Sequence, residues 1–515
     1  MSSGADGEYG IRINEDSCRR KSNLYRLICQ LARMRLIVLL FVLAWVSSAC
    51  VQETSDPFNQ QARTVEPDGP FPYSDLVRQY LSYDDPVIAL VDVKIFDGAG
   101  HLPAPNQTIV IERGRIAEVG PVDSVAIPEG AKMLRLTGRT VIPGLIGMHD
   151  HTHMPGITFM GYTASRLWLA SGVTTVQTAG SAEPEAELAL TRAIEAGEAV
   201  GPTIFPTAPY ITGPGGNGPM PKPATEEEAR ALVREWSDGG ATWFKLYRHV
   251  EPHIAAAVID EAHARGRKVT GHLCSLTFRE AALMGIDSIE HGLIAASDFV
   301  ADKPLGECVS TRHAATEIEM SDPRVAGLIN LLVREDVTLT STLAIIESHF
   351  SHRPQGDERT LALLSPEWRQ RYQGRQARLA TEDAGTMMTP ELLAKFMAFE
   401  RLFVQAGGHL VMGPDPGRHV LPGYGNQRGF ELLVEAGFTV PEALEIATAN
   451  GAEALGIAHE VGRVAQGYVA DLVILNGDLA AEPSVIRDIE VVFKDGMGFN
   501  PKKLIADVQG QVGYR

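Results

Sequence analysis

The sequence predicts an α/β protein in which a (β/α)8 barrel of the TIM type is joined to a small β-sandwich domain. Short apolar runs alternate with helical patterns through the middle of the chain, and β-rich segments flank that region on both sides. The length of 515 residues is too great for one ordinary core. A hydrophobic content of 44% and a charged content of 21% are typical of a soluble globular protein.

Eight short apolar runs predict the parallel strands of the barrel, at residues 144–149, 173–178, 203–206, 242–246, 268–272, 288–291, 337–342 and 409–413. Helical patterns lie between them, for example at 226–236 and 254–264, where apolar residues recur every three to four positions. This alternation is typical of parallel βαβ units. We therefore expect residues 143–458 to form one barrel, which falls within the usual size of ~200 to 400 residues.

Short β runs precede and follow the barrel, at 87–93, 108–112 and 132–136 before it and at 461–464, 471–475 and 489–493 after it. The C-terminal runs alone would make a poor core, because so short a segment buries too little apolar surface. We therefore expect residues 85–142 and 459–500 to fold together as the small β-sandwich domain.

The N-terminus resembles an export signal. Basic residues from Arg19 to Arg35 precede an apolar run at 36–46, which ends in Ser47, Ser48, Ala49 and Cys50. The run is too short to span a bilayer, and small residues ending at a cysteine are typical of a bacterial lipoprotein signal. We expect a signal peptide at 1–50, with translation starting at Met1 or at Met34, followed by a polar linker at 51–84. The protein is then exported, and either anchored in the periplasm or at the outer membrane by a lipid on Cys50, or secreted.

Charge and cysteine usage exclude some functions. A net charge of −18 argues against nucleic-acid binding, which needs a basic surface. The five cysteines form no CxxC pair, so neither a zinc ribbon nor a disulfide framework is predicted. Cys274 and Cys308, which lie in the barrel region, are expected as buried thiols.

Six residues at the ends of predicted strands carry the candidate chemistry: His149, His151, Lys245, His272, His291 and Asp415. His149 and His151 are two positions apart, so both side chains point to the same side of a strand. Each residue alone has an ordinary structural role as its first interpretation. All six lie at carboxyl ends of strands, however, which is the face where barrel active sites form. Together they predict a metal site, with a pairing of His151 and His153 left open as an alternative.

Several motifs resemble the amidohydrolase superfamily, in particular its imidazolonepropionase-like and Xaa-dipeptidase-like branch. They are PGLIGMHDH at 143–151, WFKLY at 243–247, VTGH at 269–272, SIEHG at 288–292 and LVMGPD at 410–415. Later segments at 429–438, 442–456 and 467–475 are also similar to the family. One departure is Gly147, where the family usually carries an aspartate.

The resemblance implies a centre of two divalent metal ions, expected to be Zn²⁺. His149, His151 and Asp415 would hold one ion, His272 and His291 the other, and Lys245 would bridge them as a carbamate. Asp415, Lys245 and His291 would be catalytic, with Asp415 moving a proton from water to the leaving nitrogen. The implied reaction is hydrolysis of a C–N bond, of an amide, peptide-like or cyclic amide type, by water that the two ions activate.

Seven residues are candidates for substrate binding: His153, Tyr210, Tyr247, Arg248, His249, Arg418 and His419. Arg248 or Arg418 would suit a carboxylate, which fits a small-molecule substrate such as a dipeptide, an N-acyl amino acid or a related amide. Three alternatives remain: a mononuclear deaminase or cyclic-amide hydrolase, a lactone or ester hydrolase at the same site, and a non-catalytic exported binding lipoprotein. Lys245 argues against the mononuclear type. The oligomeric state is not predicted.

Overall fold

The computed structural model describes residues 71–381 and 388–514. The chain divides into Met1–Gln61 and Ala62–Arg515, and all described residues belong to the second unit. The expected signal peptide and Cys50 lie outside the described residues. Within the described ranges, no helix combines the length and the apolar character that a membrane-spanning helix needs.

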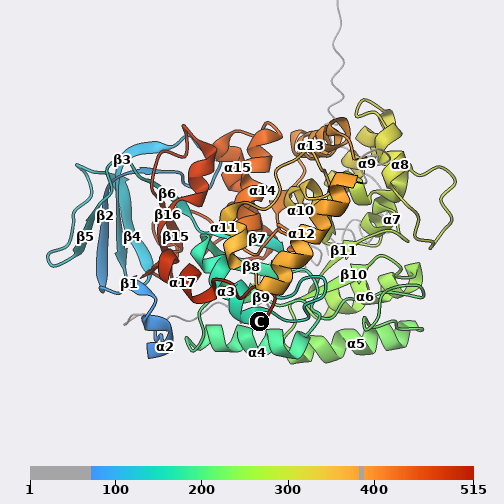
Figure 1. Cartoon of the computed structure of the whole chain (residues 1–515), viewed down its shortest axis with the longest axis horizontal. Coiled ribbons are helices and arrows are strands. Elements are labelled where there is room, and N and C mark those ends of the chain that lie inside the picture. The colour runs from blue at the N-terminus through green and yellow to red at the C-terminus, as the bar shows by residue number, and fades with distance from the viewer. Residues whose placement is uncertain (1–70, 382–387, 515) are drawn as a thin grey trace, which may run out of the picture. The chain divides into compact units, whose positions relative to one another are not determined.

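The unit contains a TIM-barrel-like α/β fold, whose eight parallel strands form two sheets rather than one continuous sheet (Figure 1). The first sheet holds β7 (Leu145–Asp150), β8 (Val173–Thr178) and β9 (Thr203–Phe205). The second holds β10 (Trp243–Tyr247), β11 (Lys268–His272), β12 (Ser288–Glu290), β13 (Thr338–Ser341) and β14 (Leu410–Met412). All eight predicted strands are present, to within one residue at each end.

Backbone contacts join the two sheets on both sides. After β9, isolated parallel bridges pair Thr207 with Trp243 and Ile211 with Leu246. At the other side, the Asp415 backbone N–H after β14 donates a hydrogen bond of 2.9 Å to the carbonyl of His149 on β7. The strands therefore meet around a common interior, which places the ends of β7 and β14 side by side.

Helices follow the strands and cover them: α3 (Gly161–Ala170), α4 (Pro184–Glu195), α5 (Glu226–Gly239), α6 (Pro252–Ala264), α7 (Phe278–Leu283), α9 (Pro323–Arg334), α13 (Pro390–Gln405) and α14 (Tyr424–Glu435). Helix α5 illustrates why they form. The Thr225 side chain accepts from the Glu228 N–H at its start, Gly240 with φ +110° ends it, and Ala229 and Val233 form its buried face. Further elements complete the barrel region: α8 (Arg312–Glu317), α10 (Leu343–Glu347), α11 (Glu358–Leu363), α12 (Pro366–Thr381), α15 (Val440–Ala447), α16 (Ala449–Ala454), η3 (Gly292–Ala295) and η4 (Ser297–Phe299).

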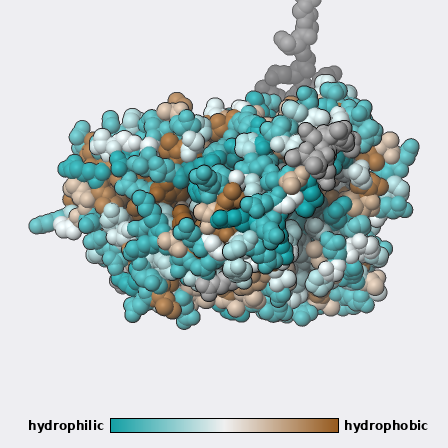
Figure 2. Space-filling model, viewed as in Figure 1, coloured by the Kyte–Doolittle hydropathy of each residue, from teal (hydrophilic) through white to brown (hydrophobic). Residues whose placement is uncertain are grey.

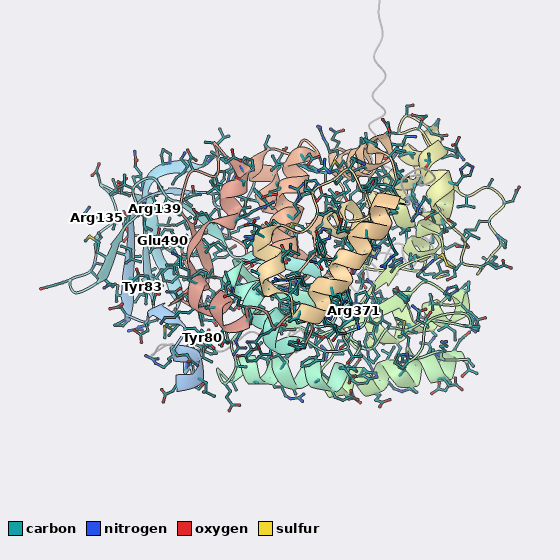
Figure 3. The ribbon with its side chains drawn as sticks, in the orientation of Figure 1. Tyr80, Tyr83, Arg135, Arg139, Arg371 and Glu490 are labelled. Carbon is teal, nitrogen blue, oxygen red and sulfur yellow. A yellow bond between two sulfur atoms is a disulfide. The ribbon has the colours of Figure 1, made fainter. Side chains whose placement is uncertain are left out.

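The segments on either side of the barrel pair in one nine-stranded mixed sheet, at the left of Figure 1. Its strands are β1 (Leu81–Tyr83), β2 (Val87–Ile95), β3 (Ala104–Glu112), β4 (Arg115–Pro121), β5 (Lys132–Arg135), β6 (Thr140–Pro143), β15 (Leu472–Leu475), β16 (Ile489–Lys494) and β17 (Met497–Phe499). Arg139 and Glu490, labelled in Figure 3, form an ion pair of 2.8 Å between the N- and C-terminal parts. The sandwich form that we expected is not confirmed by this single sheet.

Two segments differ from the sequence expectation. Residues 461–464 form no strand, whereas β17 and helix α17 (Pro501–Val508) follow the last predicted run. The end of the expected linker also has structure, because α2 (Asp75–Arg78) precedes β1, and β1 pairs with β17. The face seen in Figure 2 is mainly hydrophilic, with scattered apolar patches.

The expectation of two buried thiols was wrong, because Cys274 and Cys308 form a disulfide across 34 residues. Cys274 follows β11 by two residues, and Cys308 lies in the long segment after η4 (Ser297–Phe299). Sequence spacing gave no signal for this bond, since only the fold brings these two distant positions together.

Candidate active site

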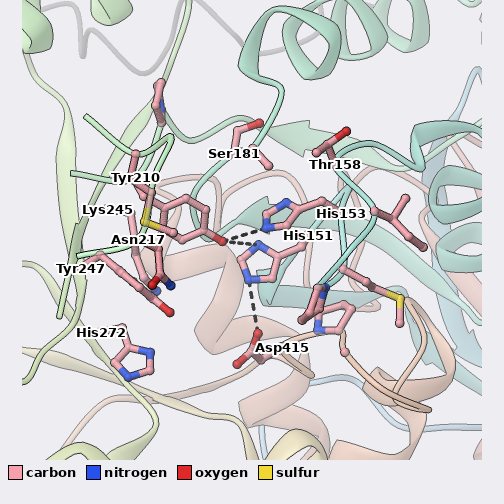
Figure 4. A pocket seen from close by; sticks show the side chains of 18 of the residues that line it. His151, His153, Thr158, Ser181, Tyr210, Asn217, Lys245, Tyr247, His272 and Asp415 are labelled. Carbon is pink, nitrogen blue, oxygen red and sulfur yellow. Dashed lines mark hydrogen bonds and ion pairs between the residues drawn. The ribbon is translucent and has the colours of Figure 1, made fainter. Parts of the chain in front are cut away.

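Three of the predicted metal ligands form a compact cluster where β7, β12 and β14 end. One ligand atom from each of His149, His291 and Asp415 lies within 4.8 Å of the others. His151 joins this group, since its Nε2 is 3.3 Å from Asp415 Oδ1, while His149 Nε2 is 3.6 Å from the same oxygen. Figure 4 shows the contact between His151 and Asp415 as a dashed line.

Lys245 and His272 line the same cavity from β10 and β11. The His272 ring lies 4.3 Å from the His291 ring, measured between centroids. The Lys245 side chain is 1% exposed, and its amine has no hydrogen-bond partner among the described residues. The same holds for His291 Nε2. Buried polar atoms are ordinarily satisfied, so these two atoms indicate a missing partner.

Burial sets the charge of this cluster. It lowers the pKa of His149, of His291 and of Lys245, and it lowers the pKa of His272 to about 3, with the positive charge of Lys245 adding to the effect on His272. Burial acts in the opposite direction on Asp415, but the surrounding histidines hold its pKa well below the ordinary value. His149, His272 and His291 therefore present neutral imidazoles near the Asp415 carboxylate, which are the protonation states that metal binding needs.

The backbone is shaped around the same residues. His291 and Asp415 have φ of +72° and +51°, a left-handed conformation that costs a non-glycine residue about 1–3 kcal/mol. Gly413 allows β14 to approach β7, because a Cβ at this position would lie 2.2 Å from the His149 nitrogen. Strained residues of this kind concentrate at functional sites.

Glu290 is a site residue that the sequence analysis missed as such. Its Oε2 lies 2.6 Å from His149 Nδ1, its Oε1 lies 3.7 Å from Lys245 Nζ, and Thr270 Oγ1 also donates to Oε1. Burial alone would raise the Glu290 pKa, yet Lys245 and His149 hold it below the ordinary value. The carboxylate must therefore accept from His149 Nδ1–H, which leaves His149 Nε2 with a free lone pair toward Asp415.

Asp150 lies between the two HxH histidines and points away from the cluster. Its carboxylate accepts from Trp168 Nε1 at 2.6 Å and from Asn426 Nδ2 at 2.9 Å, on helices α3 and α14. Burial raises its pKa to about 6. A Cβ at Gly147 would lie 1.9 Å from Asp150 Oδ2, so the Asp150 carboxylate fills the space beside Gly147. Asp150 thus ties β7 to both helices and holds the strand that carries His149 and His151.

Aromatic and histidine side chains form one wall of the cavity (Figure 4). The Tyr210 hydroxyl lies 3.0 Å from His153 Nε2 and 3.4 Å from His151 Nδ1, and its ring packs against Tyr247. Burial lowers the pKa of His153 well below the ordinary value, so its ring is neutral. His153 therefore belongs to the wall, with its Nε2 engaged by Tyr210.

The cavity has a volume of about 870 Å³. All six predicted ligands line it, together with His153, Tyr210, Tyr247 and Arg418. The other three substrate candidates do not: Arg248 lies near Cys308, His249 packs against the 213–215 loop, and His419 lines a second cavity of about 290 Å³. His349, which was not among the substrate candidates, also lines the main cavity.

The residues present fit divalent metal ions. Histidine nitrogens and a carboxylate oxygen are ligands that Zn²⁺ takes in proteins. Lys245 Nζ and His291 Nε2 are both buried in the cluster and have no hydrogen-bond partner among the described residues, as expected of atoms that bind a further group. Glu290 supplies the acceptor that commonly orients a metal-binding histidine through its other nitrogen.

The Amidohydrolase family pattern matches residues 404–511. A 5-methylthioadenosine/S-adenosylhomocysteine deaminase of Syntrophomonas wolfei is 30% identical over 126 residues, 24% of this chain and 23% of that protein. A dihydroorotase of Anaeromyxobacter dehalogenans is 31% identical over 131 residues, 24% of this chain and 29% of that protein. The chain thus spans less than a third of these curated relatives.

The structural similarities extend over most of the chain. A prolidase candidate from Bifidobacterium longum is 26% identical with a TM-score of 0.61, covering 82% of this chain and 98% of that one. A Xaa-Pro dipeptidase with methionine bound in its active site has a TM-score of 0.59 at 19% identity, covering 80% of this chain and 100% of that one. A bottromycin amidohydrolase has a TM-score of 0.63 at 20% identity, covering 87% and 97%. The last two show a shared fold.

Proposed function

We propose that this chain, a member of the amidohydrolase superfamily, is a hydrolase that cleaves a C–N bond in a small molecule at the cavity described above. The observation that carries the proposal is the set His149, His151, Lys245, His272, His291 and Asp415, which lines one cavity at the carboxyl ends of parallel strands. Amide, peptide-like and cyclic amide bonds are the proposed substrates.

We assign the ligands as two groups. His149, His151 and Asp415 would hold one divalent ion, and His272 and His291 a second, with Zn²⁺ as the proposed metal. When bound, such ions polarise the scissile carbonyl and lower the pKa of water. The close approach of His151 and His149 to Asp415 Oδ1 supports the first group.

Lys245 would bridge the two groups as a carbamate. The neutral amine attacks CO₂: the N–C bond forms, the electron pair of one C=O π bond moves to oxygen, and one proton leaves the nitrogen. The neutral amine thereby becomes an anionic oxygen ligand. Burial favours the neutral amine that this reaction needs, since it lowers the pKa of Lys245. The buried Lys245 amine has no hydrogen-bond partner among the described residues, and a carbamate would replace it by a group whose oxygens ligate the proposed ions.

Asp415 is the proposed proton carrier. Its side chain is 26% exposed, whereas those of His149 and His151 are 3% and 6% exposed, so Asp415 is more open to the cavity than either. It remains ionised, because the histidines around it hold its pKa low. Asp415 can therefore accept a proton from attacking water and return it to the leaving nitrogen.

A mononuclear hydrolase of cyclic amides, or a deaminase, is the second candidate. The compact group of His149, His291 and Asp415 favours it, since one ion satisfies these three atoms. The names of the two curated relatives, a deaminase and a dihydroorotase, are also in its favour. Ester or lactone hydrolysis would use the same residues.

The decisive experiment measures metal content and hydrolysis of Zn²⁺-loaded protein on dipeptides, N-acyl amino acids, cyclic imides and lactones, with Lys245→Ala as the variant. We expect two ions per chain, amide hydrolysis, and loss of both in the variant. A ¹³C-bicarbonate NMR spectrum of the intact protein should show a carbamate signal that the variant lacks. Metal-loaded protein that hydrolyses none of the amides would overturn the proposed substrate class. One ion per chain with an active variant would establish the mononuclear candidate.

We also propose that the eight strands close into one (β/α)8 barrel. The bridges after β9 and the hydrogen bond between Asp415 and His149 support closure.

We further propose that the protein is exported, with Cys50 as the lipid anchor. The Cys274–Cys308 disulfide supports export, because disulfides persist mainly in oxidising compartments. Radiolabelled palmitate incorporation that Cys50→Ser abolishes would test the anchor.

A further inference from the structure

Arg418 is a cation in the wall of the catalytic cavity, three residues beyond Asp415. Its Nη1 donates to Ser348 Oγ at 2.9 Å, and it makes no ion pair with any acidic side chain of the described residues. Two other partly buried arginines are balanced, because Arg353 and Arg428 both pair with Glu347 and Glu435. Charges that leave bulk water are ordinarily paired, so among the described residues Arg418 lacks a carboxylate in direct contact.

The surroundings of Arg418 add positive charge. Burial, and then Arg375 and Arg312, lower its pKa to about 10 against the opposing effect of the Asp415 carboxylate, so the guanidinium stays charged at neutral pH. His349 lines the same part of the cavity, and burial together with Arg418 and Arg375 lowers its pKa to about 3. The neighbouring imidazole is therefore neutral, and the charge available to a ligand is that of the guanidinium.

The backbone at Arg418 holds the side chain in an unusual way. Its φ is +60°, in the left-handed region that costs a non-glycine residue free energy. The loop from Asp415 to Arg418 thus contains two such residues, of which one belongs to the metal cluster and the other faces the cavity. The Arg418 guanidinium lines the cavity and contacts no carboxylate among the described residues, so it can bind an anionic ligand there.

We propose that Arg418 binds an anionic group of the substrate, a carboxylate, while the bond to be cleaved lies at the cluster around Asp415. The planar guanidinium presents parallel N–H donors that match the two oxygens of a carboxylate. This inference rests on the proposed function and narrows it, because neutral amides and lactones without an anionic group would be poor substrates. Arg418 is a specificity residue in this assignment, not a catalytic one.

The test compares an N-acetyl amino acid with its carboxamide, on the metal-loaded full chain. We expect the carboxylate to have the higher kcat/KM, and Arg418→Met to lower kcat/KM for it by about 10- to 100-fold, with little effect on the carboxamide. Arg418→Lys should retain part of the preference, because it keeps the charge but loses the planar fork. Methionine is preferred to glycine since it keeps the same backbone strain at φ +60°.

The matched control is Arg371→Met, which removes an exposed arginine on α12 that pairs with Glu367 (Figure 3). It should leave the preference unchanged. Calorimetric binding of the N-acetyl amino acid, with metal content measured in each variant, separates the two hypotheses. Binding that Arg418→Met weakens, without hydrolysis of any amide, would support the anion subsite while refuting the proposed function. Hydrolysis of both compounds at equal efficiency, or an unchanged preference in Arg418→Met, would overturn the subsite and leave the function standing.

Discussion

Replacing Glu290 by glutamine tests a site residue that lies in the SIEHG motif but was not among the predicted ligands. The change keeps the shape of the side chain but removes its negative charge, 2.6 Å from His149 Nδ1 and 3.7 Å from Lys245 Nζ. Glutamine can still accept from His149 through its oxygen, so the ring is not expelled. The ligand loses the charged acceptor that makes its Nε2 a stronger donor to a metal.

The size of the effect follows from this one contact. A hydrogen bond to a charged group contributes about 1.5–3 kcal/mol, and His149 and Glu290 are both almost fully buried, so solvent screens little of it. Each 1.4 kcal/mol corresponds to a tenfold change in affinity. We therefore expect Glu290→Gln to weaken Zn²⁺ binding by about 10- to 100-fold.

The assay is competition for Zn²⁺ between the metal-free protein and a chromophoric chelator at neutral pH. Glu347→Gln is the matched control, because Glu347 is also a buried carboxylate but pairs with Arg353 and Arg428 and not with a ligand. Circular dichroism of both variants establishes that they are folded. A folded Glu290→Gln variant that binds Zn²⁺ within twofold of the parent protein would refute the role that we give to Glu290.

Two further predictions concern stability. Burial raises the pKa of Glu400 to about 8 from an ordinary value of 4.5, so the folded state binds a proton that the unfolded state releases between these values, and stability is lost as pH rises through this window. Glu400→Gln should therefore gain stability relative to the parent between pH 5 and pH 8.5, by up to about 4 kcal/mol. Glu391→Gln, which changes an exposed residue on the same helix, should not. The same difference in melting temperature between Glu400→Gln and the parent at both pH values would contradict this prediction. Replacing Cys274 and Cys308 together by serine opens a loop of 34 residues, which should cost about 3–4 kcal/mol and lower the melting temperature by about 4 °C. Calorimetry of both proteins without reductant measures the difference, and an unchanged melting temperature would show that the disulfide does not stabilise the fold.

The barrel strands were predictable because their signal is local. Each is a short apolar run bounded by turn residues, and the run length itself distinguishes it from the longer helices between. The ligand candidates were predictable for the same reason, since each directly follows or ends such a run. The failed strand at 461–464 shows the limit. The segment contains Gly462 and Arg463 between its two valines and forms no strand, and Val464 packs in the sheet core from a loop instead.

Local pattern alone determined the order of strands and helices, the strand ends, and the identity of the candidate ligands at those ends. Tertiary structure decided everything that depends on pairs of residues far apart in sequence. Glu290 and His149 are separated by 141 positions, and the Cys274–Cys308 bond and the arginines around Arg418 are likewise non-local. Burial lowers the pKa of histidines and of Lys245, and it exists only once these segments pack together. Desolvation is a property of the folded interior and not of any single stretch of chain.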